Sequence, residues 1–153
     1  MPVLSALIGQ LGVALGLDSL ELEDGRQCSL VFNDARRVTI DYSPENREVI
    51  FSGVIGPASR YQSEAGCRRL LSMSLLGVET GGAAFGLAED TDELLLWKRF
   101  DDAFADATDI VRALESFYAR MEYCAATLND VTNVVSKPDD AQPGTQPYMG
   151  MRV

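Results

Sequence analysis

The chain contains few residue combinations that could catalyse a reaction. None of its 153 residues is a histidine, so a serine or cysteine nucleophile would lack the imidazole base that activates most such groups. Four glycines cluster at positions 77, 81, 82 and 86, but they match neither the GxGxxG nor the Walker A pattern. No phosphate-binding loop is therefore predicted, and we do not expect an enzyme.

Acidic residues gather in two segments, 21–24 and 89–93. Neither segment has the spacing of a calcium-binding EF-hand loop. The sequence also selects no single pair of carboxylates for acid–base catalysis. Solvated turns, in which acidic side chains bond to the local backbone, explain both segments.

The three cysteines, Cys28, Cys67 and Cys124, are odd in number and have no CxxC spacing. Such a set indicates reduced thiols rather than a disulfide framework. A zinc site would need an added carboxylate as its fourth ligand. We expect each thiol to be buried among apolar side chains, and we expect no metal or cofactor.

Composition indicates a soluble protein with an ordinary core, because 46% of the residues are hydrophobic and 24% are charged. The formal net charge of −10 argues against nucleic acid or an anionic membrane surface as the main partner. Residues 1–17 are apolar but too short to cross a bilayer, and they lack the basic region and cleavage site of a signal peptide.

Hydrophobic periodicity predicts the order helix, three strands, helix, two strands, helix. The first helix ends near Gly16, three strands alternate between residues 28 and 55, and a second helix runs from Ser59 or Ser63 to Leu76. Strands at 84–88 and 93–98 form a hairpin, and the last helix extends from about residue 104 to 135. This is an α+β fold with helices on one side of an antiparallel sheet. Residues 1–135 form one domain, and residues 136–153 form a disordered tail rich in proline and glycine.

Several elements are apolar on more than one face, notably the first helix, the strand at 49–55 and the second helix. Complete burial would explain them, but a domain of this size has few elements that can be covered on both sides. The surplus apolar surface therefore indicates a binding partner.

Three stretches, LELEDGRQCSLVFND, VTIDYSPENREVIFSGVIG and LLSMSLLGVETGGAAFGLAEDTDELLLWKRF, follow one another in the chain. In this order they resemble the class I chaperones of bacterial type III secretion, the family named after the Tir chaperone. The last stretch is the most specific, with a helix ending in Leu-Leu-Gly, a Thr-Gly-Gly turn and a hairpin with a polar bend. The resemblance covers residues 1–135.

The resemblance implies a homodimer of the bacterial cytoplasm that binds the N-terminal region of one or a few secreted effectors and delivers it to the export machinery. An alternative is a small-molecule-binding or regulatory domain, which would have an enclosed pocket. In the family the second helix and nearby strands form the dimer contact, which here gives the candidates Leu70, Leu71, Met73, Leu75, Leu76 and Trp97. The effector would lie on the first helix and the sheet, where the candidates are Leu4, Leu7, Ile8, Leu11, Val31 and Ile50.

Overall fold

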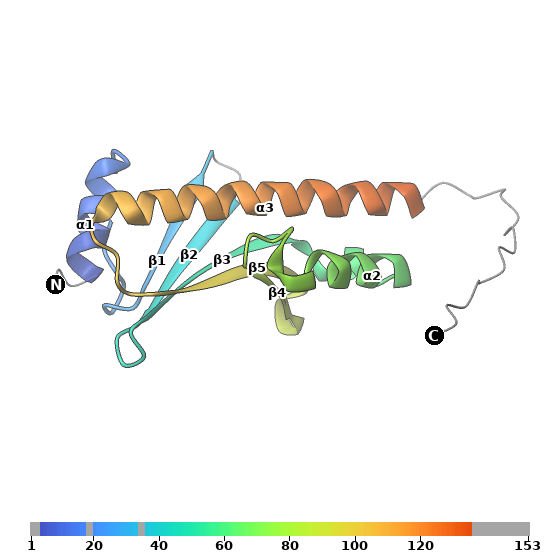
Figure 1. The fold of residues 1–153 in the computed structure, drawn as a ribbon, viewed down its shortest axis with the longest axis horizontal. Coiled ribbons are helices and arrows are strands. Elements are labelled where there is room, and N and C mark those ends of the chain that lie inside the picture. Colours follow the sequence, from blue (N-terminus) through green and yellow to red (C-terminus); the bar gives the residue numbers. More distant parts are fainter. Residues whose placement is uncertain (1–3, 18–19, 34–35, 136–153) are drawn as a thin grey trace, which may run out of the picture.

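The computed structural model describes residues 4–17, 20–33 and 36–135. It confirms the predicted α+β class and the predicted order of the elements (Figure 1). The predicted tail, residues 136–153, lies outside the described residues. In chain order the elements are α1 (Leu4–Ala14), β1 (Gln27–Phe32), β2 (Arg36–Ser43), β3 (Glu48–Pro57), α2 (Glu64–Met73), β4 (Ala84–Ala88), β5 (Glu93–Asp101) and α3 (Ala107–Val135).

The strands form one antiparallel sheet of five, in the spatial order β1-β2-β3-β5-β4. The predicted meander is confirmed, because β1 pairs with β2 and β2 pairs with β3. The predicted hairpin of β4 and β5 is confirmed as well. The hairpin joins the meander through its second strand, because β5 pairs with β3 and leaves β4 at the edge.

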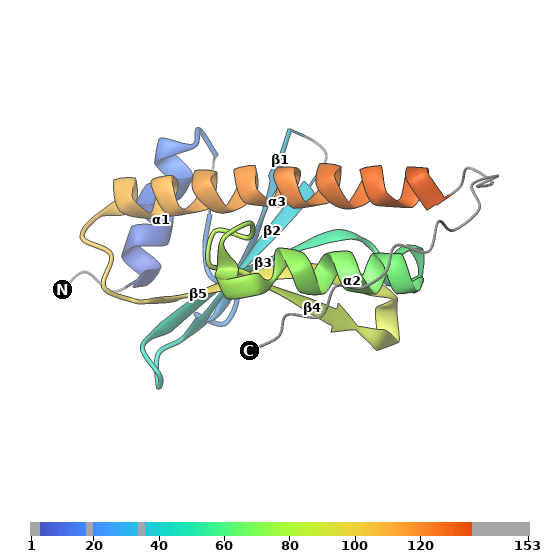
Figure 2. The same cartoon turned by 45° about the vertical axis from the view of Figure 1, so that its right-hand side comes forward.

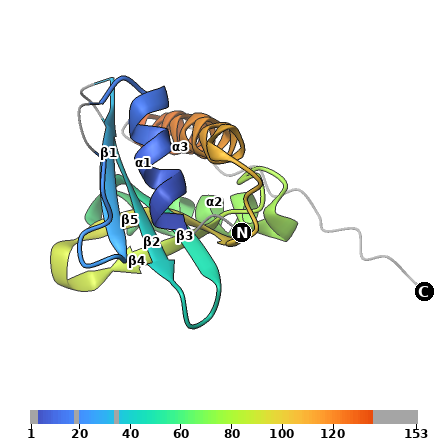
Figure 3. The same ribbon diagram turned by 90° about the vertical axis from the view of Figure 1, so that its left-hand side faces the viewer.

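One face of the sheet forms the core, because the side chains of each strand alternate between the two faces. The buried strand residues are Cys28, Leu30, Val38, Ile40, Val49, Phe51, Ile55, Leu94 and Leu96. Helices α1 and α3 lie over this face, and α2 packs against α3 (Figures 1 and 3). The long helix α3 presents one apolar stripe to the sheet, as a three-and-four residue spacing requires. Its buried residues include Ile110, Leu114, Phe117, Met121, Cys124 and Leu128.

The second helix is shorter than predicted. Its start agrees with the prediction, because the Ser63 hydroxyl caps it by accepting a hydrogen bond of 3.1 Å from the Gly66 amide. It ends at Met73, however, so the predicted extension to Leu76 is wrong. The Ser74 hydroxyl donates to the Leu70 carbonyl at 2.7 Å, and Leu76 has the left-handed angles φ 54° and ψ 14°. Figure 2 shows α2 beside α3, with β4 next to it.

The last helix begins at Ala107, three residues later than the periodicity predicts. The Asp106 carboxylate accepts a hydrogen bond of 3.0 Å from the Asp109 amide and so satisfies a free donor of the first turn. Phe104 belongs to the segment before the helix, where its ring lies 6.0 Å from that of Phe100. The apolar spacing therefore extends to Phe104, before the helix begins.

Candidate functional site

The described residues contain no cluster of three or more histidine, cysteine, aspartate or glutamate side chains that could hold a metal ion. A hollow of about 550 Å³ is an open surface depression between the β2–β3 turn and the end of β5. It is lined by Asn46, Arg47, Glu48, Arg99, Phe100, Asp101, Asp102 and Ala103. This open depression differs from the enclosed pocket that a small-molecule-binding domain would have.

Burial separates the three thiols into two classes. Cys28 and Cys124 are buried as predicted, but Cys67 is exposed, so its predicted burial is wrong. Burial raises the pKa of the Cys28 and Cys124 thiols from 9.0 to about 11, and the charges of Asp41 and Glu23 add to the effect at Cys28. Both buried thiols therefore stay protonated at neutral pH and are poor nucleophiles.

A group of exposed apolar side chains lies where α2 ends. It consists of four side chains with exposed fractions of 74%, 68%, 91% and 76%, and we call it the loop patch: Leu71, Leu75, Leu76 and Val78. Four exposed aliphatic side chains within eight residues are unusual for a surface that meets only water. The predicted dimer candidates Leu71, Leu75 and Leu76 are all part of the loop patch, and Val78 was not predicted.

The other three dimer candidates lie elsewhere. Met73 is fully buried in the core, so it supports α2 from inside and adds nothing to the surface. Leu70 is half-buried and, with Cys67 and Leu87, lines a hollow of about 360 Å³ between α2 and β4. Trp97 is half-buried on β5, where the Arg99 guanidinium lies 5.8 Å from its ring.

A chain of polar contacts holds the loop that carries the patch. The loop between the 3₁₀ turn at Leu75–Gly77 and β4 is closed by a hydrogen bond of 2.8 Å from the Gly82 amide to the Gly77 carbonyl. Inside the loop, Thr80 is buried and its hydroxyl donates to the Ala83 carbonyl at 2.6 Å. Lys98 on β5 donates to the Gly81 carbonyl at 2.7 Å.

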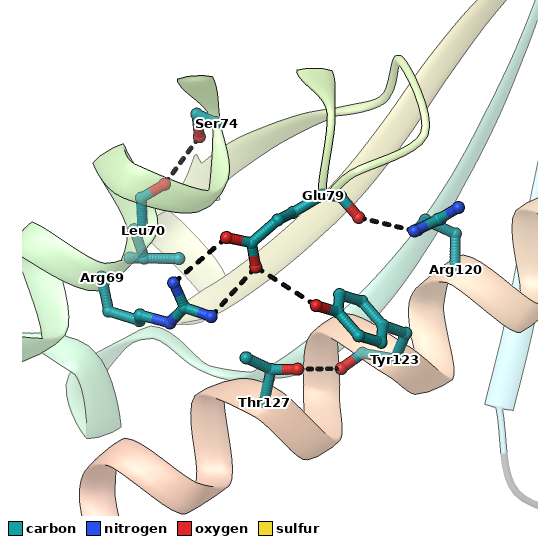
Figure 4. A network of polar contacts seen from close by, with 7 residues as sticks. All are labelled: Arg69, Leu70, Ser74, Glu79, Arg120, Tyr123 and Thr127. Carbon is teal, nitrogen blue, oxygen red and sulfur yellow. Dashed lines mark hydrogen bonds and ion pairs between the residues drawn. The ribbon is translucent and has the colours of Figure 1, made fainter. Parts of the chain in front are cut away.

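Glu79 is the centre of this loop (Figure 4). Arg69 on α2 donates two hydrogen bonds to its carboxylate, of 3.3 and 2.9 Å, and the Tyr123 hydroxyl on α3 donates a third of 3.3 Å. Arg120, also on α3, donates to the Glu79 backbone carbonyl at 2.9 Å. The loop is therefore fastened to both α2 and α3. Spacing gave no signal for this cluster, because its members are distant in the sequence.

A second uncovered surface is the face of the sheet that points away from α1 and α3, which we call the outer face. Val31 on β1 and Ile50 on β3 both lie on it, so two of the predicted effector residues share one surface. Cross-strand pairing places Val54 beside Leu95 and Ser52 beside Trp97. The hydroxyls of Ser29 and Thr39 lie 3.1 Å apart between these apolar positions. Strand β2 contributes only polar and charged side chains to this face, with Arg37 opposite Val31 and Asp41 opposite Ile50. The outer face therefore mixes apolar positions on β1, β3 and β5 with a polar and charged strip on β2.

The four effector candidates on α1 lie in the core instead. Leu4, Leu7, Ile8 and Leu11 are all buried, and they anchor the helix over the sheet and against α3. They would reach a partner only if α1 left the core. The exposed apolar residues near the end of α1 are Val13, Leu15 and Leu17. The apolar spacing thus identified the core face of this helix.

Across the part of the chain that the structure describes, no helix is long and apolar enough to cross a membrane.

Proteins of similar fold are found among the solved structures. A search of curated proteins finds no match. Among solved structures, a chain of the ExsC–ExsE complex is 20% identical, with a TM-score of 0.64 over 80% of this chain and 87% of that one. A chain of the HopA1–SchA chaperone–effector complex is 13% identical, with a TM-score of 0.65 over 84% and 94%. The Yersinia pestis type III secretion chaperone SycH, solved with a fragment of YscM2, is 20% identical, with a TM-score of 0.61 over 81% of this chain and 98% of that one.

At these low sequence identities the solved structures show only a shared fold. The family is shown by a match between this sequence and a family profile. The profile of the Tir chaperone protein (CesT) family matches residues 6–125, which include every described strand and most of α1 and α3. The predicted resemblance is thereby confirmed. The chain belongs to the Tir chaperone protein family, a family of chaperones rather than enzymes.

Proposed function

We propose that this protein is a bacterial cytoplasmic chaperone of type III secretion that acts as a homodimer. It binds the N-terminal region of one or a few secreted effectors, keeps that region soluble and presents it to the export machinery. The observation that supports the proposal best is the presence of exposed apolar side chains on two separate surfaces, the loop patch and the outer face, that the protomer does not cover.

The loop patch suits contact with a second copy of the chain. Its four aliphatic side chains belong to one short segment, and the neighbouring hollow beside Leu70 and Leu87 extends the apolar surface along α2 to β4. A specific interface usually needs about 800 Å² from each partner, so the patch and the hollow together form the natural centre of one. A two-fold axis would use the same surface on both copies.

The outer face and the adjacent sheet edge suit an extended effector segment. Strand β1 lies at one edge of the sheet, and an edge strand offers unpaired backbone groups to an added strand. Val31, with 58% of its surface exposed, lies on this strand. Ile50, Val54 and Trp97 add apolar side chains on β3 and β5, on the far side of the polar strand β2. Main-chain pairing would supply affinity, and the apolar side chains would supply selectivity.

The unfolded state of the effector segment also explains how the chaperone can release it. Ordering a flexible segment consumes part of the binding free energy, typically several kcal/mol, so a large contact can stay reversible. No nucleotide or metal is needed for this cycle on the chaperone's side. Delivery would then depend on transfer of the segment to the export machinery.

The test uses the purified chaperone and the N-terminal segment of the secreted protein encoded by the adjacent reading frame. Sedimentation should give a dimer, and titration calorimetry should give saturable binding of the segment. Val31→Asp and Val54→Asp should each weaken binding at least tenfold without changing the dimer, because each places a charge on the outer face. The matched control is Ala119→Asp, an exposed position on α3.

Equal binding by Val31→Asp, Val54→Asp and Ala119→Asp would contradict the outer face as the effector site. A chaperone that ignores every secreted substrate of its own organism would contradict the function itself.

A further inference from the structure

The segment from Ser74 to Ala83 adopts an unusual backbone conformation. Leu76 has a positive φ of 54° although it is not glycine, and it is followed by glycines with positive φ at positions 77, 81 and 82. Left-handed geometry is disfavoured for a leucine. Because 91% of Leu76 is exposed, packing within the protomer does not hold it there. Other contacts must therefore impose this conformation.

The Glu79 cluster provides such contacts. The Arg69–Glu79 ion pair is partly buried, with side-chain exposures of 27% and 31%. By comparison, the Arg68–Glu64 pair on the same helix has exposures of 78% and 81%. A two-bond pair shielded from water is stronger and more directional than an exposed one. The carboxylate thus fixes the distance between the loop and α2.

Two more cations fix the backbone of the same loop. Arg120 and Lys98 donate to the carbonyls of Glu79 and Gly81, from α3 and β5 respectively. A β-carbon at Gly81 would lie only 2.9 Å from the Arg120 side chain, so the loop and α3 approach each other closely. Three elements of the fold therefore contact Glu79 and Gly81, directly after the loop patch ends at Val78.

We propose that Glu79 is the positioning residue of the homodimer, and this inference rests on the dimer proposed above. By joining α2, the loop and α3, Glu79 holds Leu75, Leu76 and Val78 in the arrangement that a second copy meets. Preorganisation of this kind raises affinity because the ordering cost is met during folding rather than during association. Glu79 itself need not touch the partner.

The first test compares Glu79→Gln with Glu64→Gln. Both remove one carboxylate charge from an ion pair with an arginine of α2, but only Glu79 holds the loop. Sedimentation equilibrium should show a dimer dissociation constant at least tenfold higher for Glu79→Gln and within twofold of wild type for Glu64→Gln. Tyr123→Phe, which removes only the hydroxyl bond to Glu79, should raise the dissociation constant about two- to fivefold. This milder variant tests the inference even if Glu79→Gln does not fold.

The second test separates positioning from general stability. In a monomeric background, Leu76→Asp, hydrogen exchange is measured for the Gly82 and Ala83 amides, which bond to the Gly77 and Thr80 carbonyls. Adding Glu79→Gln should accelerate exchange of these two amides at least tenfold and leave the Ile40 amide on β2 unchanged. Equal acceleration at all three amides would indicate a general loss of stability and would overturn the inference.

The outcomes distinguish this inference from the proposal on which it rests. A wild-type chain that stays monomeric at every concentration would overturn the dimer and the positioning role together. A wild-type dimer whose dissociation constant is unaffected by Glu79→Gln and Tyr123→Phe would overturn only the role of Glu79.

Discussion

Replacing Leu76 by asparagine should stabilise the protomer and weaken the dimer. Leucine at φ 54° and ψ 14° is strained, and left-handed geometry costs an L-residue about 1–2 kcal/mol. Asparagine tolerates this region better than leucine. Since 91% of Leu76 is exposed, its removal leaves no cavity. The free energy of unfolding of the monomer should therefore rise, by up to about 1 kcal/mol, a gain comparable with those seen when local strain is relieved.

The same substitution should cost the dimer much more. Complete burial of a leucine side chain is worth about 1.5–3 kcal/mol, and nearly all of Leu76 is available for burial. A two-fold interface contains the residue twice, so the loss is about 3–6 kcal/mol. The dissociation constant should then rise about 10²- to 10⁴-fold.

The two effects require separate measurements, because the dimer makes apparent stability depend on concentration. Sedimentation velocity over a dilution series gives the dissociation constant. Urea unfolding, at a concentration where both proteins are monomeric, gives the stability of the protomer. Val13→Asn is the matched control: it removes another aliphatic side chain, 80% exposed, at the end of α1 and outside the loop patch. Its dissociation constant should match that of wild type.

An unchanged dissociation constant for Leu76→Asn would show that Leu76 lies outside the interface. A monomer that becomes less stable would refute the strain argument, because it would mean that the leucine side chain stabilises the loop despite its exposure.

At neutral pH a thiol reagent should label Cys67 within minutes, and mass spectrometry should find Cys28 and Cys124 labelled only after unfolding. The free energy of unfolding should fall as the pH rises from 9 to about 11, because the thiols of the unfolded chain ionise first, and urea titrations across that range would detect it. Gly66→Ala should lower the free energy of unfolding by about 1–3 kcal/mol, although alanine favours helices, because a β-carbon there would lie 2.6 Å from the Tyr61 carbonyl oxygen. Thermal or urea unfolding tests this, and a more stable variant would contradict the expected clash.

Hydrophobic periodicity was sufficient to identify the helices and strands, but it did not show where each of them begins and ends. Alternation at Cys28 and Leu30 placed β1 correctly because one face of that strand is buried. The prediction made the second helix too long because four leucines at helical spacing, at positions 70, 71, 75 and 76, continue the pattern. In the structure, the hydrogen bond from the Ser74 hydroxyl to the Leu70 carbonyl accompanies the earlier end of the helix. The insertion of β5 between β3 and β4 depends on pairing between distant segments, which periodicity does not encode.

The candidate site was predictable in part for a related reason. Hydrophobic spacing shows that a face is apolar, but not whether the protomer covers it. Leu7 and Leu11 on α1 are covered by the protein's own core, whereas Leu71 on α2 and Leu75 just after it have the same four-residue spacing and are exposed. Only the arrangement of α1 over the sheet decides between the two cases.

The two uncovered surfaces differ in composition in a way that fits their proposed partners. The loop patch has only aliphatic side chains at its centre, held in place by the partly buried Arg69–Glu79 pair. A rigid apolar surface gives tight association, because little ordering remains to be done on contact. The outer face instead mixes half-buried apolar residues such as Ile50 with the hydroxyls of Ser29 and Thr39. Covering those hydroxyls without replacing their bonds to water is unfavourable, so a segment laid across them binds less tightly per unit area. A chaperone that stays dimeric while it releases its effector needs this difference in strength.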